Sequence, residues 1–68
     1  MDMKIGARVW LRQADDAPVR DRTDAAAAFE VIETATGATG PVCLLTAHDP
    51  LISTLYAGWH PLARLIRI

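Results

Sequence analysis

The chain has 68 residues, of which 51% are hydrophobic, and its formal net charge is −1. This length predicts one small domain over residues 1–68. The near balance of seven basic and eight acidic side chains argues against a general polyanion binder. The apolar content is high for so small a monomer. We therefore expect part of the apolar surface to be buried against another subunit, most simply in a homodimer.

Cysteine content and hydropathy bear on the location of the protein. The single cysteine, Cys43, excludes an internal disulfide. No stretch reaches the roughly 18 apolar residues of a membrane-spanning helix, so no membrane partner is expected. Lys4, Arg8 and Arg12 interrupt the N-terminal region where an export signal would need an apolar run. These features predict a cytoplasmic protein with a reduced thiol.

The first predicted element is a half-buried strand over residues 4–13, because apolar and polar side chains alternate there. One face of this strand is apolar and should enter the core: Ile5, Ala7, Val9 and Leu11. The other face is cationic and carries a tryptophan: Lys4, Arg8, Trp10 and Arg12. Residues 13–22 then contain adjacent acids and Pro18, which predict a turn or an exposed loop.

A helix is predicted over residues 24–36. Asp24 is a suitable N-cap, with Thr23 as the alternative, and four alanines follow it. Apolar residues recur at three- and four-residue spacing: Ala25, Ala28, Phe29, Ile32 and Ala35. Gly37 would end the helix in a left-handed conformation.

A central strand is predicted over residues 42–47, which are apolar on both faces and bounded by Pro41 and Asp49. Cys43 would lie within this strand as a buried, inert thiol. The preceding strand and helix then predict a right-handed crossover between parallel strands.

The segment over residues 50–57 allows two interpretations. Asp49 as N-cap and Pro50 in the first turn favour a short helix with Leu51, Ile52 and Leu55 facing inward. The competing interpretation is a strand, because Ile52, Thr54 and Tyr56 are β-formers. Residues 59–61 are predicted as a turn, and residues 62–68 as a last strand.

The expected fold is therefore α+β, or a small α/β fold, with element order β-α-β-(short α or β)-β. It has a sheet of three or four strands with one main helix on one face.

Two histidines and an aspartate suggest possible metal chemistry. His48, Asp49 and His60 could supply two imidazoles and a carboxylate to a metal ion in a small metal-dependent enzyme. However, their spacing fits no short helical ligand motif, and a His-Asp pair in a turn is typically a solvated cap. We therefore expect no metal, no cofactor and no catalytic residue.

The remaining candidate surface is a set of cationic and aromatic side chains suited to binding: Lys4, Arg8, Trp10, Arg12, Tyr56 and Trp59. Tryptophan, tyrosine and arginine are enriched at the centres of protein interfaces. The sequence thus favours a non-enzymatic protein that binds another protein, or itself, through a sheet face or edge. An inhibitor of the phage or mobile-element type, which covers a host protein surface, is one form of this function. The alternative is a nucleic-acid-binding protein that uses the cationic first strand.

Overall fold

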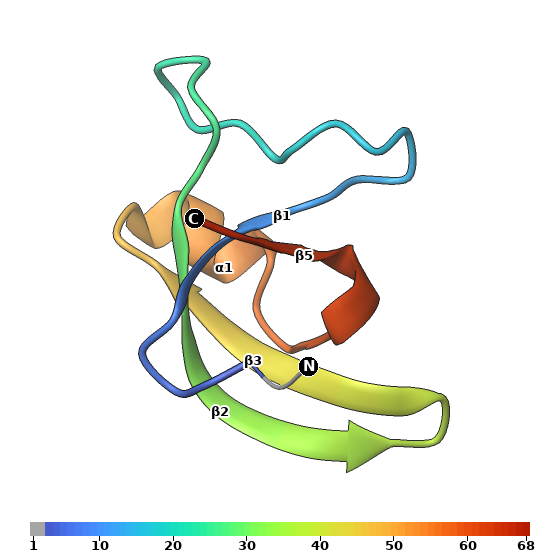
Figure 1. Ribbon diagram of the computed structural model, residues 1–68. Helices are drawn as coiled ribbons and strands as arrows, with labels where there is room; N and C mark the ends of the chain where they lie inside the picture. Colours follow the sequence, from blue (N-terminus) through green and yellow to red (C-terminus); the bar gives the residue numbers. More distant parts are fainter. Residues whose placement is uncertain (1–2) are drawn as a thin grey trace.

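The computed structural model describes residues 3–68 and contains one five-stranded antiparallel sheet with strand order β4-β3-β2-β1-β5 (Figure 1). The strands are β1 (Arg8–Leu11), β2 (Phe29–Gly37), β3 (Gly40–Ala47), β4 (Trp59–Pro61) and β5 (Leu65–Arg67). A short helix, α1 (Pro50–Leu55), joins β3 to β4, and a 3₁₀ turn, η1 (Leu62–Arg64), precedes β5. Consecutive strands from β1 to β4 are neighbours, and the last strand returns to pair with the first.

The predicted main helix over residues 24–36 is absent, so the prediction of a sheet covered by one such helix is wrong. Residues 29–37 form the long strand β2, in which Phe29 and Val31 are buried and Glu30 is exposed. The preceding alanines lie in the loop, and Asp24 occupies a left-handed turn with φ of 63°. The helix preference of alanine amounts to a few tenths of a kcal/mol per residue, about 0.7 at most. Burial of Phe29 and Val31 outweighs it.

The predicted crossover between parallel strands is also wrong, because β2 and β3 form an antiparallel hairpin. Their register pairs Phe29 with Ala47 at the open end and Gly37 with Gly40 at the turn. The register shifts between Val31 and Glu33, which identifies Ile32 as a bulge residue. After this bulge Thr34 lies opposite the buried Cys43, and Ile32 remains 43% exposed.

The hairpin turn requires a glycine at position 40. Ala38 and Thr39 between the strands keep negative φ, and Gly40 has φ of +129°, a conformation that side chains rarely adopt. We expect Gly40→Ala to destabilise the fold by about 1 kcal/mol or more, although space for a Cβ is open. Urea unfolding followed by circular dichroism would measure this. A Gly40→Ala variant as stable as the wild type would contradict the strained geometry.

Strand β1 is shorter than predicted and begins at Arg8. Gly6 has φ of +90°, and the Ala7 N–H donates to the Lys4 carbonyl at 3.0 Å, which closes a turn before the strand. The turn breaks the alternation expected from residue 4. As a result Ile5 is 67% exposed rather than buried, whereas Val9 and Leu11 enter the core as expected.

The helical interpretation of the segment after β3 is confirmed. Asp49 accepts a hydrogen bond from the Leu51 N–H, and Pro50 occupies the first turn of α1. The helix is a single short segment that buries Ile52 alone. Leu51 and Leu55 are 49% and 65% exposed, so the prediction that they face inward is wrong. Residues 59–61, predicted as a turn, form β4, and residues 62–64 of the predicted last strand form η1.

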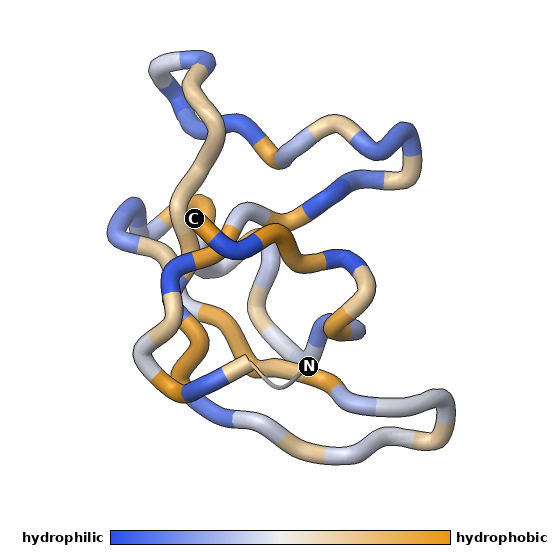
Figure 2. Tube along the Cα trace, viewed as in Figure 1, coloured by the Kyte–Doolittle hydropathy of each residue, from blue (hydrophilic) through white to orange (hydrophobic). Residues whose placement is uncertain are grey.

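The core lies on the inner side of the curved sheet and gathers residues from every part of the chain. Its buried members are Val9, Leu11, Val19, Ala27, Phe29, Val31, Cys43, Leu45, Ile52 and Leu65. Two of them belong to the long loop between β1 and β2, which is mostly hydrophilic in Figure 2. There the Ala27 N–H donates to Val19 O, and the Val19 N–H donates to Leu11 O, both at 2.8 Å. The two buried side chains hold this acidic loop against the sheet.

Candidate functional site

The outer face of β1 carries three of the predicted binding residues. Val9 and Leu11 are buried, so the alternating side chains of Arg8, Trp10 and Arg12 point to the opposite side. Arg8 and Arg12 are exposed, and Trp10 is half-buried. The sequence pattern therefore placed these three side chains correctly on one surface.

Strand β5 extends this surface. Trp10 lies opposite Ile66 in the antiparallel register, and the Ile68 N–H donates to Arg8 O at 3.0 Å. The Arg12 N–H likewise donates to Arg64 O at 2.8 Å. Opposite residues in an antiparallel pair share a face. We call the resulting surface the β1–β5 face, and its members are Arg8, Trp10, Arg12, Arg64, Ile66 and Ile68.

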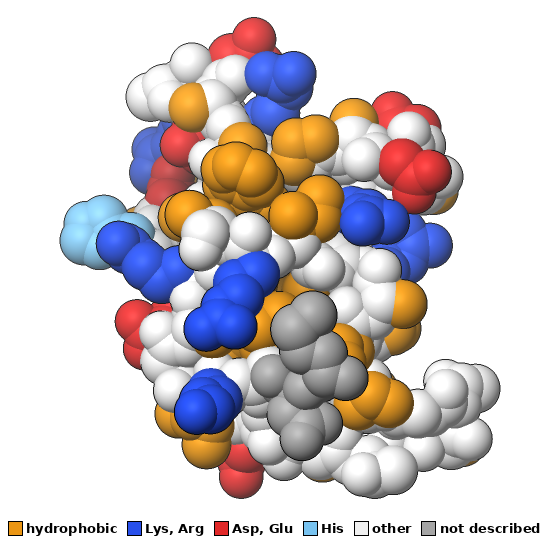
Figure 3. Space-filling view, in the orientation of Figure 1, with side chains coloured by type: hydrophobic (Ala, Val, Ile, Leu, Met, Phe, Trp, Pro, Cys, Tyr) orange, Lys and Arg blue, Asp and Glu red, His pale blue; other side chains and the backbone are white. Residues whose placement is uncertain are grey.

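The β1–β5 face has an apolar centre and a cationic surround. Trp10 and Ile66 are half-buried, and Ile68 is 57% exposed. Figure 3 shows hydrophobic side chains gathered over β1 and β5, with Lys and Arg side chains on both sides of them. Arg12 and Arg64 lie opposite each other, and an Arg64 Nη1 donates to Arg12 O at 3.4 Å. Two like charges facing each other across a strand pair cost stability.

Positive charge is concentrated in the two chain segments that carry this face. Neither residues 3–14 nor residues 50–68 contain an aspartate or glutamate. They carry five of the seven basic side chains, namely Lys4, Arg8, Arg12, Arg64 and Arg67. In the described part of the chain, ion pairs join the other two, Arg20 and Arg22, to Asp24 and Asp49. Across the sheet, Glu30 lies opposite Arg8. The overall charge of −1 therefore conceals a cationic surface.

The other predicted binding residues lie elsewhere. Lys4 precedes β1 in the Gly6 turn. Tyr56 packs edge-on against Phe29, with ring centroids 6.0 Å apart and an interplanar angle of 84°, and so supports the core. Trp59 is 47% exposed on β4, opposite Leu44, at the end of the strand order remote from β5. The structure thus separates these three residues from the β1–β5 face.

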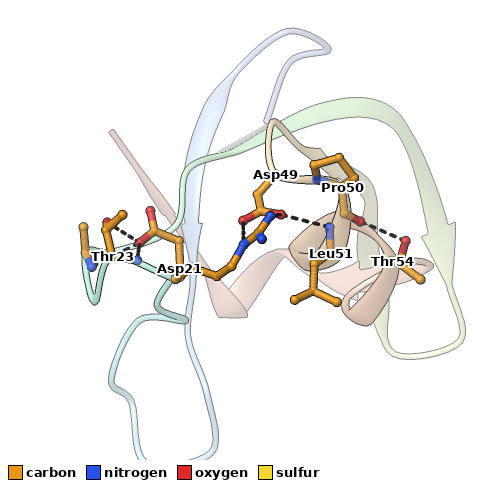
Figure 4. A network of polar contacts seen from close by, with 8 residues as sticks. Asp21, Thr23, Asp49, Pro50, Leu51 and Thr54 are labelled. Carbon is orange, nitrogen blue, oxygen red and sulfur yellow. Dashed lines mark hydrogen bonds and ion pairs between the residues drawn. The ribbon is translucent and has the colours of Figure 1, made fainter.

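His48, Asp49 and His60 do not combine into a metal site. His60 Nε2 hydrogen-bonds the Tyr56 carbonyl at 2.7 Å, and His48 is exposed in the turn before α1. Asp49 caps α1 and receives two hydrogen bonds from Arg22, at 2.9 and 3.0 Å (Figure 4). Within residues 3–68 no three His, Cys, Asp or Glu side chains are grouped to hold a metal ion. The geometry therefore gives Asp49 and His60 structural contacts.

The contact between Arg22 and Asp49 makes the stability of the fold depend on pH. The Arg22 hydrogen bond, aided by the Leu51 N–H, lowers the pKa of Asp49 below its usual value. A lowered pKa stabilises the fold above the unfolded-state value of about 3.9, and this contribution disappears as the pH falls through the folded-state pKa. The Thr23 hydroxyl lowers the pKa of Asp21 in the same sense.

We therefore expect the melting temperature to fall below about pH 4, and to fall less steeply in Asp49→Asn. Asparagine keeps the capping oxygen but carries no titrating charge, so it isolates the ion pair from the cap. Melting curves between about pH 2 and pH 7 measure the difference. Equal acid slopes in the wild type and Asp49→Asn would contradict a stabilising ion pair.

Cys43 is buried and offers no nucleophile to solvent. It is 2% exposed in β3, and burial raises the pKa of its thiol. A raised pKa leaves less thiolate at neutral pH, and the thiolate is the reactive form. The interpretation of Cys43 as a buried thiol is confirmed.

A shallow hollow adjoins the β1–β5 face. It has a volume of about 360 Å³, and its polar lining includes Arg8, Glu30, Thr46 and His48. Thr46 belongs to a side-chain hydrogen bond with Ser53, with 3.2 Å between the hydroxyl oxygens. Arg8 is common to the hollow and the β1–β5 face.

The sequence did not identify the contribution of β5. Arg64, Ile66 and Ile68 alternate as Arg8, Trp10 and Arg12 do, and this period-two pattern was the available signal. Their position beside β1 depends on pairing between residues as far apart as 12 and 64.

In the described residues, no helix is long and apolar enough to cross a membrane. Comparison of the chain with family models, curated proteins and solved structures found no match.

Proposed function

We propose that the protein is a non-enzymatic binding protein that engages a protein partner through the β1–β5 face. The single observation that carries this proposal is the arrangement of the face, in which Trp10, Ile66 and Ile68 form an apolar centre bordered by arginines. Protein interfaces commonly have an apolar core and a polar rim, with tryptophan and arginine among the most important contacts.

The charge of the face favours an acidic partner surface. Arg8, Arg12 and Arg64 surround the apolar centre, and the segments that carry them contain no carboxylate. Carboxylates on the partner would pair with these guanidinium groups and accelerate association at low salt. The single buried thiol supports a cytoplasmic site of action, which is part of the same proposal.

Nucleic acid is the second candidate, and the five basic side chains in the segments that carry β1 and β5 favour it. Arginines would contact phosphates, and Trp10 would stack on an unpaired base. The exposed Ile68 and half-buried Ile66 at the centre of the face favour the protein partner, because nucleic-acid interfaces are more polar.

The test compares two tryptophans in a capture experiment from the native host. Wild-type protein, Trp10→Ala and Trp59→Ala are immobilised at equal density, and the retained proteins and nucleic acids are identified. We expect a discrete acidic protein on wild type and Trp59→Ala and at least about a tenfold loss on Trp10→Ala. Equal capture by all three proteins, or capture of nucleic acid alone, would overturn the proposal. Light scattering on each sample reports whether the retained partner is a second copy.

A further inference from the structure

Strand β5 forms one edge of the sheet, and among residues 3–68 it pairs only with β1. In an antiparallel pair, alternate residues direct their N–H and C=O groups toward the partner strand. The hydrogen bonds from Ile68 N to Arg8 O and from Arg12 N to Arg64 O fix this alternation. Trp10 and Ile66 lie midway between these two pairs, so their N–H and C=O groups point toward each other across the two strands. The backbone groups of Leu65 and Arg67 therefore point away from β1.

Three of those outward groups remain free of internal bonds. The Leu65 N–H donates to Leu62 O and closes η1. Within residues 3–68, the Leu65 carbonyl and the N–H and carbonyl of Arg67 have no hydrogen-bond partner. An N–H and a C=O on one residue, with a second C=O two residues earlier, match the bonding pattern of one further strand.

The other edge of the sheet is less suited to strand addition. Strand β4 ends at Pro61, which has no N–H, and the chain turns into η1 immediately after it. Proline is one of the features by which proteins protect a sheet edge from pairing. The sequence of β5, Leu-Ile-Arg, contains no proline, so the outward N–H of Arg67 is present.

We propose that an extended, acidic segment of the partner protein adds to the sheet beside β5. This inference rests on the proposed function and specifies how the partner binds. The added strand would bond to Arg67 and Leu65, and its outward side chains would lie beside Ile66 and Ile68 on the β1–β5 face. Carboxylates on that face would pair with Arg64 and carboxylates on the opposite face with Arg67, in a segment of 19 residues, 50–68, without an acidic side chain.

The free protein provides the first test, by hydrogen exchange of individual amides in NMR spectra. We expect the amides of Ile66 and Ile68 to be protected by their bonds to β1, and the Arg67 amide to exchange at least about tenfold faster. An Arg67 amide as protected as its neighbours would mean that the edge is already closed, and would overturn the inference.

The second test uses synthetic probes and two substitutions at one position. The probes are a capped octapeptide of alternating valine and glutamate, its lysine counterpart and a single-stranded oligo-thymidylate. We expect the glutamate peptide to bind and to slow exchange of the Arg67 amide. Arg67→Ala removes the charged side chain but keeps the backbone N–H, and should weaken binding several-fold. Arg67→Pro also removes the N–H and should weaken it by about a further tenfold, the worth of one backbone hydrogen bond at the strong end of its range. Melting curves confirm that both variants fold.

Each result separates strand addition from the broader proposal. Equal binding of the glutamate peptide to Arg67→Ala and Arg67→Pro would overturn strand addition, as would no binding at millimolar peptide. In either case the capture experiment with Trp10→Ala would still test whether a protein partner binds the β1–β5 face. Equal binding of the lysine peptide would overturn charge recognition. Binding of oligo-thymidylate in place of the peptide would overturn both proposals in favour of nucleic acid.

Discussion

Phe29→Ala should remove between about a third and all of the stability of the protein at room temperature. The Phe29 side chain is 2% exposed and stands between Val9 and Ala47 across three strands, with Tyr56 against its ring. Truncating a buried phenylalanine to alanine costs about 3–5 kcal/mol. A domain of this size has a total stability of roughly 3–10 kcal/mol, at about 0.05–0.15 kcal/mol per residue. The substitution therefore removes a large part of the total.

Ile32→Ala is the matched control for this experiment. Ile32 lies three residues further along the same strand, at the bulge, and is 43% exposed. Its truncation should cost well under half as much, because much of the side chain already contacts water. Urea unfolding monitored by circular dichroism compares the two variants. A Phe29→Ala protein that unfolds cooperatively with the same midpoint as Ile32→Ala would contradict the position of Phe29 at the centre of the core.

The contrast between residues 24–36 and 50–55 explains which parts of the fold could be predicted. At Asp49 and Pro50, local chemistry and structure agree, because a capping carboxylate and a first-turn proline determine a helix start within a few residues. In 24–36, the alanine run and the spacing of Phe29 and Ile32 indicated a helix. The strand found there buries Phe29 and Val31 and exposes Glu30, an alternation with period two. Pairing with β1 and β3 decided between helix and strand, and that information is not local.

In the candidate site, too, local patterns predicted some features and strand pairing determined the others. The alternation through Arg8, Val9, Trp10 and Leu11 was sufficient to place Arg8 and Trp10 on the outer face, since a strand has a fixed two-residue period. The turn at Gly6 removed Lys4 from that strand, because a positive φ breaks the period. Whether the arginines of the C-terminal segment joined the same face depended on which strand β5 paired with, and composition alone could not determine that.

Arg64→Glu should weaken partner binding while leaving stability unchanged or slightly increased. Arg64 lies opposite Arg12, so a glutamate there replaces a like-charge pair by an opposite-charge pair. Cross-strand pairs of this kind contribute about 0.2–1 kcal/mol, and exposure places this one at the lower end. Against an acidic partner, the same substitution replaces attraction by repulsion at the border of the apolar centre. We expect binding to fall by at least about tenfold at low salt, mainly through slower association.

Arg20→Glu provides the same change of charge away from the β1–β5 face, in the loop between β1 and β2. It should leave association with the captured partner close to the wild-type rate and lower stability slightly, since Arg20 pairs with Asp24 at 3.8 Å. Thermal melting and association rates at low and high salt give two independent readouts for each variant. If Arg64→Glu raises the melting temperature and slows association, the pair of Arg12 and Arg64 serves binding at a cost in stability. A parallel loss of stability and binding would instead assign Arg64 a structural role and remove the charge argument for an acidic partner.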